Sequence, residues 1–240
     1  MPIILCNPYA DPNRYDPSFL GVTALLHYDG TNGSTMVIDS SALHLNPVNT
    51  GVILTDSVAK FGPTSGAFNG TTSVMALGDK PGRLGNVDFT IECWVYPQAS
   101  TSRFPCIFGN YTSWYGGNGG LAIFVGHFSA DRTKYQVALN GTFPAIQSAA
   151  TIVLNQWIHV AVVRYNNVIT LYLDGVANGS YTVPAGQSFD GVGNATSVGL
   201  AADTTADGYL HACMDEFRIT KGLARYTANF TPPASAFPDA

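Results

Sequence analysis

The chain has 240 residues and a net charge of −5, and only 11% of its residues are charged, well under half of the ~25% that is usual in soluble domains. Of its 16 acidic residues, only Glu92 and Glu216 are glutamates, and the aspartates that make up the rest favour turns over helices. With 25 Gly, 14 Pro, 12 Tyr and 13 Phe, this composition is typical of strands joined by tight turns, and it excludes helix bundles, coiled coils and disordered chains.

Residues 1–21 hold four of the 14 prolines. Because proline lacks an N–H donor and resists helix formation, this segment is predicted to be an extended arm. The arm either straps its own domain or docks onto a neighbouring subunit. The first residues lack a basic region followed by an apolar stretch, so we expect no secretory signal, and no run reaches the ~20 apolar residues that span a bilayer.

From Val22 onward, short apolar runs are interrupted by Gly, Asn or Asp at roughly the 8–12-residue spacing of a sandwich or barrel. The strands that this pattern predicts cover residues 22–28, 51–55, 66–70, 73–77, 88–96, 120–127, 134–139, 157–165, 168–174, 176–183, 197–201 and 208–220. The one segment that could form a helical turn lies at 221–226. Strands without intervening helices pair antiparallel, so we expect an all-β sandwich of two antiparallel sheets over residues 22–240.

Two of these segments carry the clearest signals. In 88–96 (DFTIECWVY), Phe89, Ile91, Cys93 and Val95 alternate with Thr90, Glu92, Trp94 and Tyr96, so the two sets should point to opposite faces. The strands 157–165 and 168–174 are joined by Asn166-Asn167, residues that tolerate the positive φ of a type I′ hairpin turn.

The cysteines within these strands do not form a metal or redox motif. Cys93, Cys106 and Cys213 lie in apolar runs without the paired CxxC spacing of such sites. We interpret them as buried free thiols, and a disulfide between Cys93 and Cys106 remains the alternative if their strands are neighbours.

The last strand and the residues after it, GYLHACMDEFRITKGLARYTANFTPP from Gly208, resemble the closing signature of laminin-G-like, concanavalin A-like jelly rolls, most of all the version common in phage and other viral structural proteins. Further motifs follow in the family's order: LLHYDG from Leu25, KFG from Lys60, SGAFNG from Ser65, DFTIECWVYP from Asp88, WIHVAVVR from Trp157 and LYLDG from Leu171. The resemblance covers about residues 22–238 and implies a jelly-roll sandwich, a fold that hosts lectins, hydrolases, adhesion modules and virion parts alike.

The sequence predicts a protein without catalytic residues. The glucanases of this fold carry a Glu-x-Asp-x-x-Glu string along one strand, and no such string occurs here. Glu92 and Glu216 are isolated on separate strands, where we expect surface or rim carboxylates. The five histidines form no HExxH motif.

The resemblance also implies a structural Ca²⁺ where the first strand meets the last. The matching positions are Asp29 and Asp215, with oxygen atoms from residues 66–69, ending at Asn69, nearby. Calcium binds six to eight oxygen ligands, several of which can be backbone carbonyls. The alternative is that the two aspartates cap turns or pair with Arg218.

A glycine-rich loop is the predicted carbohydrate-binding site. It carries Tyr111, Trp114 and Tyr115, whose rings can stack on sugars, and Asn118, whose amide can bind hydroxyl groups. The competing interpretation is that these aromatic side chains plug the end of the sandwich or fill a subunit contact.

Two functions are therefore expected. The first is a non-enzymatic structural protein on the virion surface, a capsid decoration or tail-associated domain that assembles in the host cytoplasm. It would contact other virion proteins through its arm and form a homo-oligomer such as a trimer. The second is a carbohydrate-binding module that recognises host surface glycans. The 11 Lys and Arg residues are scattered, which argues against nucleic-acid binding, and membrane insertion is not expected.

Overall fold

The computed structural model describes residues 16–110, 120–127, 129–191, 196–200 and 207–239. Within these ranges the chain forms β-strands and two 3₁₀ turns, η1 (Phe19–Gly21) and η2 (Lys80–Gly82). The helical turn expected at 221–226 is wrong, because these residues form the last residue of a strand followed by bends. No helix in the described part of the chain has the length and apolar character that a bilayer crossing requires.

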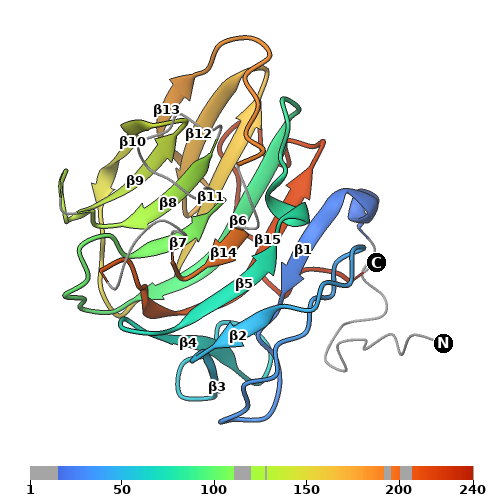
Figure 1. Ribbon diagram of the computed structural model, residues 1–240, viewed down its shortest axis with the longest axis vertical. Coiled ribbons are helices and arrows are strands. Elements are labelled where there is room, and N and C mark those ends of the chain that lie inside the picture. Colours follow the sequence, from blue (N-terminus) through green and yellow to red (C-terminus); the bar gives the residue numbers. More distant parts are fainter. Residues whose placement is uncertain (1–15, 111–119, 128, 192–195, 201–206, 240) are drawn as a thin grey trace.

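The strands form two antiparallel sheets that stack into a sandwich (Figure 1), which confirms the predicted fold class. Sheet A has the order β13-β12-β11-β6-β15-β4-β3, with β1 also paired to β15. Sheet B has the order β10-β9-β8-β7-β14-β5-β2. The strands of sheet A are β1 (Val22–Leu26), β3 (Ile53–Thr55), β4 (Ser65–Asn69), β6 (Phe89–Pro97), β11 (Ile158–Tyr165), β12 (Val168–Leu173), β13 (Val176–Thr182) and β15 (His211–Lys221). Those of sheet B are β2 (Val48–Thr50), β5 (Val74–Gly78), β7 (Cys106–Gly109), β8 (Leu121–Val125), β9 (Lys134–Leu139), β10 (Thr142–Thr151) and β14 (Thr196–Val198).

The core lies between the sheets and follows the alternation that the sequence predicts. Phe89, Ile91, Cys93 and Val95 of β6 are all buried in it. Each large apolar side chain that is buried in this way stabilises the fold by roughly 1.5–3 kcal/mol. The hairpin turn is also confirmed, since Asn166 (φ 48°) and Asn167 (φ 64°) both adopt positive φ.

The sequence pattern did not predict three of the strands: β2, β7 and β10. The longest, β10, is an edge strand that contains Pro144 and has no regular apolar alternation in its sequence. Proline is tolerated there because an edge strand uses only one of its two hydrogen-bonding sides. The other two strands have only three and four residues, too few to show a period.

We expected the outer face of sheet A, the face turned away from sheet B, to be open to solvent, but the structure shows that other parts of the chain cover much of it. Ala224, Tyr226 and Phe230 pack over Ala161, Val163 and Tyr172, and Phe237 packs over Val22 and Leu25. Glu92 and Glu216 are consequently 1% exposed, so the expectation of surface or rim carboxylates is wrong. The cover comes from chain segments that are remote in sequence.

The cysteines and the end of the arm are placed by the same structure. Cys93, Cys106 and Cys213 are buried free thiols, as interpreted, and Cys93 and Cys106 lie in different sheets. Of the arm, residues 16–21 are described. They lie on their own sandwich, where Asp16 pairs with Arg225.

Candidate functional site

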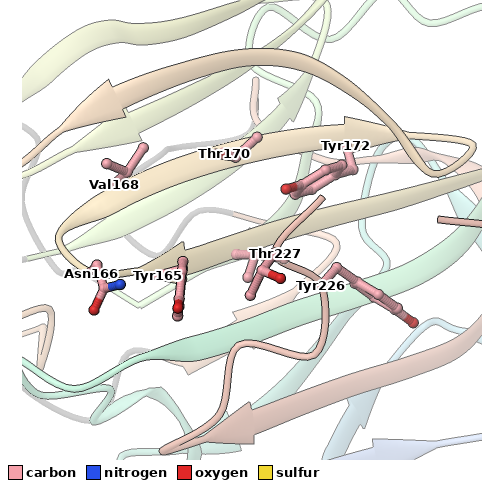
Figure 2. A pocket seen from close by; sticks show the side chains of 8 residues that line it. Tyr165, Asn166, Val168, Thr170, Tyr172, Tyr226 and Thr227 are labelled. Atoms are coloured by element: carbon pink, nitrogen blue, oxygen red, sulfur yellow. The ribbon is translucent and has the colours of Figure 1, made fainter. Parts of the chain in front are cut away.

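A shallow pocket of about 220 Å³ lies on the outer face of sheet A, between the β11–β12 hairpin and the segment that crosses it (Figure 2). Its lining combines tyrosines, small polar residues and two valines, all of them uncharged: Val163, Tyr165, Asn166, Val168, Thr170, Tyr172, Tyr226 and Thr227. Strand alternation explains the set, because Val163 pairs with Thr170 and Tyr165 with Val168 across the hairpin, so both pairs share one face.

The walls of this pocket differ in how they are held. Tyr165 is 45% exposed and stands at the open side. Tyr226 is fixed by two contacts, since its ring stacks on Phe230 (3.5 Å between centroids, 4° between planes) and its hydroxyl donates to Glu92 Oε2 (2.8 Å). Tyr172 is buried beneath Phe230, 5.5 Å from it between ring centroids. The pocket is therefore preformed on its inner side.

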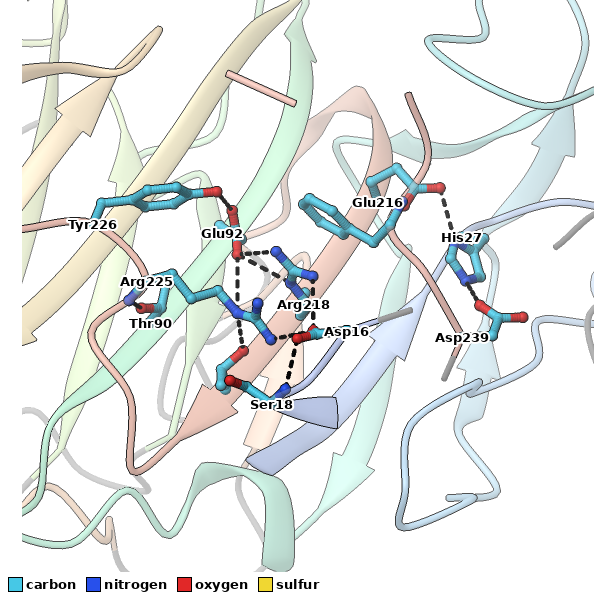
Figure 3. Close-up of polar contacts among 12 residues, drawn as sticks. Asp16, Ser18, His27, Thr90, Glu92, Glu216, Arg218, Arg225, Tyr226 and Asp239 are labelled. Atoms are coloured by element: carbon cyan, nitrogen blue, oxygen red, sulfur yellow. Dashed lines mark hydrogen bonds and ion pairs between the residues drawn. The ribbon is translucent and has the colours of Figure 1, made fainter. Parts of the chain in front are cut away.

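Glu92 is the centre of a buried ionic network behind the pocket (Figure 3). Arg218 donates to Glu92 Oε1 from Nε (3.0 Å) and Nη2 (2.7 Å), and His159 Nε2 lies 3.2 Å from Oε2. Burial alone would raise the pKa of Glu92, but Arg218 and His159 lower it to about 2. With Tyr226 on its other oxygen, this carboxylate is ionised, buried and committed to structural contacts.

The network continues into the chain ends. Arg225 donates to Thr220 Oγ1 (2.7 Å) and to Asp16 Oδ2 (2.5 Å), and Arg218 Nη1 lies 3.6 Å from the same Asp16 oxygen. Burial raises the pKa of Asp16, but the hydrogen bonds from Arg225 and Ser18 and the charges of Arg225 and Arg218 together outweigh burial, so the pKa is lowered. The ion pairs thus fasten the end of the arm to the last strand and to the segment that carries Tyr226.

Glu216 belongs to a second buried cluster. His27 bridges two carboxylates, with Nδ1 2.7 Å from Glu216 Oε1 and Nε2 2.5 Å from Asp239 Oδ1. Burial lowers the pKa of His27, but Asp239 and Glu216 together raise it to about 10. The backbone N–H of Phe237 donates to the remaining oxygen of Glu216 (2.6 Å). This cluster anchors the C-terminal residues, and the His27 imidazolium offsets one of its two carboxylate charges.

The structure brings Asp29 and Asp215 together, as the calcium expectation requires. Asp215 Oδ2 accepts the backbone N–H groups of Lys60 (2.9 Å) and Phe61 (3.1 Å), while a Cβ on Gly62 would clash with the Asp29 carboxylate. Both carboxylates therefore contact one loop. Burial, followed by the charges of Glu216 and Asp29, holds the pKa of Asp215 well above its usual range.

Asp215 Oδ1 is buried and has no hydrogen-bond partner among the described residues. An orphaned carboxylate oxygen beside a second carboxylate fits a hard cation, which would gain its remaining oxygens from carbonyl groups and water. Asn69 is not part of this pair. Its Oδ1 accepts the N–H groups of the following turn, including Thr72 (2.8 Å), and it sits opposite His211, four residues from Asp215 on β15. In the described ranges, no three His, Cys, Asp or Glu residues gather in a metal-binding arrangement.

The predicted carbohydrate residues Tyr111, Trp114, Tyr115 and Asn118 lie outside the described residues. The structure does describe the residue at the base of their loop. Asn110 is buried, donates from Nδ2 to the carbonyls of Gly82 (2.7 Å) and Phe189 (2.9 Å), and accepts the Leu121 N–H at Oδ1 (2.6 Å). Asn110 is therefore held in place at the end of β7.

Sequence reasoning missed the pocket. Tyr165 and Tyr172 follow the outer-face alternation of the clearest hairpin, and this was the available signal. The sequence carries no such signal for Tyr226 and Thr227, because only the folded chain brings their segment across β11 and β12.

Two stacked antiparallel sheets with this strand order define a lectin-type jelly roll. Residues 69–224 match the family model Laminin_G_3, described as the concanavalin A-like lectin/glucanases superfamily. The chain belongs to this family, and the resemblance inferred from its motifs is confirmed. A search of curated proteins found no match to this sequence.

Several solved structures share the fold. Domain 4 of AbnA, a GH43 extracellular arabinanase from Geobacillus stearothermophilus solved with arabinotriose, has a TM-score of 0.61 and 21% identity over 85% of this chain and 93% of that one. The binding domain of botulinum neurotoxin serotype D/C VPI 5993 has a TM-score of 0.57 and 13% identity, over 85% of this chain and 49% of that one. Trypanosoma rangeli sialidase in complex with sialic acid has a TM-score of 0.56 and 13% identity, over 83% of this chain and 30% of that one. At these identities the similarity establishes the fold.

Proposed function

We propose that the chain is a non-catalytic carbohydrate-binding module whose ligand occupies the pocket beside the β11–β12 hairpin. The observation that supports this most is the pocket lining: the exposed ring of Tyr165, the inner wall of Tyr172 and Tyr226, the amide of Asn166 and the hydroxyls of Thr170 and Thr227. Aromatic rings stack on the apolar faces of sugars, and amide and hydroxyl groups bind their hydroxyls. The arabinanase domain with the same fold was solved with an oligosaccharide.

The absence of catalysis in this proposal rests on the state of the two glutamates. A glycosidase requires two carboxyl groups about 5–9.5 Å apart that flank the scissile bond. Glu92 and Glu216 belong to different buried clusters, and each has both oxygens engaged by neighbouring groups. Neither can approach a sugar without dismantling its cluster.

Other expectations stay predictions beside this one. We propose calcium at Asp29 and Asp215 as a structural ion, and the loop with Tyr111, Trp114, Tyr115 and Asn118 as a second contact for sugar. The virion location, the contacts of the arm with other virion proteins and the homo-oligomer follow from the sequence resemblance alone. A module on a particle surface could bind glycans, so the two functions are compatible.

A glycan array followed by titration calorimetry tests the proposal. The wild-type chain is expected to bind at least one class of glycan, and Tyr165→Ala is expected to weaken that binding by on the order of tenfold, since one stacked aromatic is worth 1–3 kcal/mol in comparable contacts. Tyr209→Ala is the matched control, because Tyr209 is partly exposed outside the pocket. Binding that Tyr165→Ala leaves unchanged would remove the pocket from the proposal.

A further inference from the structure

We infer that the pocket takes a neutral sugar and rejects an acidic one, such as a sialic acid or a uronic acid. This inference rests on the proposed function and specifies its ligand class.

The lining of the pocket is composed of uncharged side chains. None of the eight described residues that line the pocket carries a charge. Recognition of a sugar carboxylate depends on charge-assisted hydrogen bonds, most strongly from an arginine fork. The amide of Asn166 and the hydroxyls of Thr170 and Thr227 supply neutral donors and acceptors instead, which match the hydroxyl groups of an uncharged sugar.

The two arginines that precede lining residues in the sequence already bind other groups of the protein. Arg164 precedes Tyr165, but its side chain is buried and donates to the carbonyl of Gln187 (2.6 Å) and to Asn167 Oδ1 (2.8 Å). Arg225 precedes Tyr226, and its guanidinium is bound to Asp16. Recruiting either one for a ligand would break a buried contact.

A negatively charged side chain, that of Asp88, lies at the rim of the pocket. The Asp88 carboxylate accepts the backbone N–H of Asn166 (3.1 Å), which places a negative charge beside a lining residue. The chain as a whole carries −5. An acidic sugar would therefore meet the negative charge of Asp88, which the buried Arg164 offsets only in part, and no cationic side chain among the described lining residues; like-charge juxtaposition selects against such a ligand.

The test compares matched glycans on the full chain. The array carries neutral glycans beside their sialylated or uronic counterparts, for example lactose with α2,3-sialyllactose and α1,4-galactotriose with trigalacturonate. We expect the neutral member of a pair to bind at least about tenfold more tightly, and Tyr165→Ala to reduce that binding. High salt should narrow the preference, because it screens the repulsion.

Two substitutions change the charge at the pocket and keep its tyrosine walls, although Thr227→Lys also replaces a lining hydroxyl. Thr227→Lys puts an ammonium group at the pocket and is expected to raise the affinity for the acidic member, whereas Thr151→Lys, on an exposed position of β10, adds the same charge elsewhere and should not. Asp88→Asn, which keeps an acceptor for the Asn166 N–H, should also raise the affinity for the acidic member of the pair.

The outcomes separate the two proposals. Equal or tighter binding of acidic glycans that Tyr165→Ala abolishes would overturn the neutral-sugar inference and leave the carbohydrate-binding function standing. Failure of every glycan to bind, or binding that is indifferent to Tyr165→Ala, would overturn the function of this pocket and the inference with it.

Discussion

Glu92 of β6 and Arg218 of β15 form a buried ion pair on the outer face of sheet A, in which the guanidinium donates two hydrogen bonds to one carboxylate oxygen. The ring of Phe237 covers Arg218, with its centroid 3.6 Å from Cζ. Asp16 and Tyr226 complete the surroundings of the pair. Segments near both ends of the chain are therefore held by a single charge cluster, which also positions one wall of the proposed sugar site.

Removing one partner of this pair should cost much more stability than removing an exposed ion pair. Glu92→Gln removes the nearer counter-ion of the buried Arg218 and leaves only the Asp16 carboxylate, 3.6 Å away, so we expect the free energy of unfolding to fall by about 3 kcal/mol. Urea denaturation measures this loss. Arg83→Met breaks the exposed pair with Asp79 and serves as the control, with an expected change within about 1 kcal/mol. Similar losses for both variants would contradict the structural role of Glu92.

The contact between Tyr226 and Glu92 can be separated from the pocket wall. Tyr226→Phe removes the hydroxyl but keeps the ring stacked on Phe230, so it should cost about 1–2 kcal/mol of stability and change glycan affinity less than about twofold. Tyr226→Ala removes the wall as well and should weaken glycan binding strongly. Calorimetry and urea denaturation of both variants measure the two effects. A Phe variant that loses binding as fully as the Ala variant would assign the hydroxyl to the sugar.

Stability should depend on alkaline pH through His27. The pKa of His27 is raised from 6.5 to about 10, so the folded state binds the proton more tightly than the unfolded state. The stabilisation is therefore fully present below pH 6.5 and is lost as the pH rises through about 10. Urea midpoints of wild type and His27→Gln measured across this range should converge towards pH 10. Midpoints that stay parallel would show that His27 does not titrate with Glu216 and Asp239.

Calcium should stabilise the chain through Asp29 and Asp215. An ion that binds only the folded state at saturating concentration adds a few kcal/mol, so millimolar Ca²⁺ should raise Tm by roughly 5 °C over chelator-treated protein. Asp215→Asn and Asp29→Asn should each abolish the shift, which differential scanning calorimetry measures. Asn69→Ala should retain it, because Asn69 caps a separate turn. An unchanged Tm of the wild type in Ca²⁺ would end the proposal.

Much of the fold was predictable because its signals are local. The alternation of Phe89 with Thr90 along β6 reflects the twofold period of any strand, whatever it packs against. Asn166 and Asn167 likewise predict their hairpin turn, since positive φ is a property of the residues themselves. β10 was missed for the converse reason, because an edge strand with a proline carries no such period.

Of the candidate sites, the pairing of Asp29 with Asp215 could be anticipated, since it follows from motifs at the first and last strands of a known fold. The pocket could not, because Tyr165 and Tyr226 meet only when the C-terminal segment crosses the β11–β12 hairpin. The same applies to Glu92, which alternation assigned to the correct face but to the wrong environment.

The sequence by itself determined which side chains share a face and where the chain turns, because strand period and backbone conformation are decided within a few residues. Only the tertiary structure decided which faces are covered. Glu92 is ionised and buried, and not a solvated rim carboxylate, because Arg218 and Tyr226 reach it from far along the chain and exclude water. Burial and charge compensation depend on such long-range contacts, and a linear pattern carries no record of them.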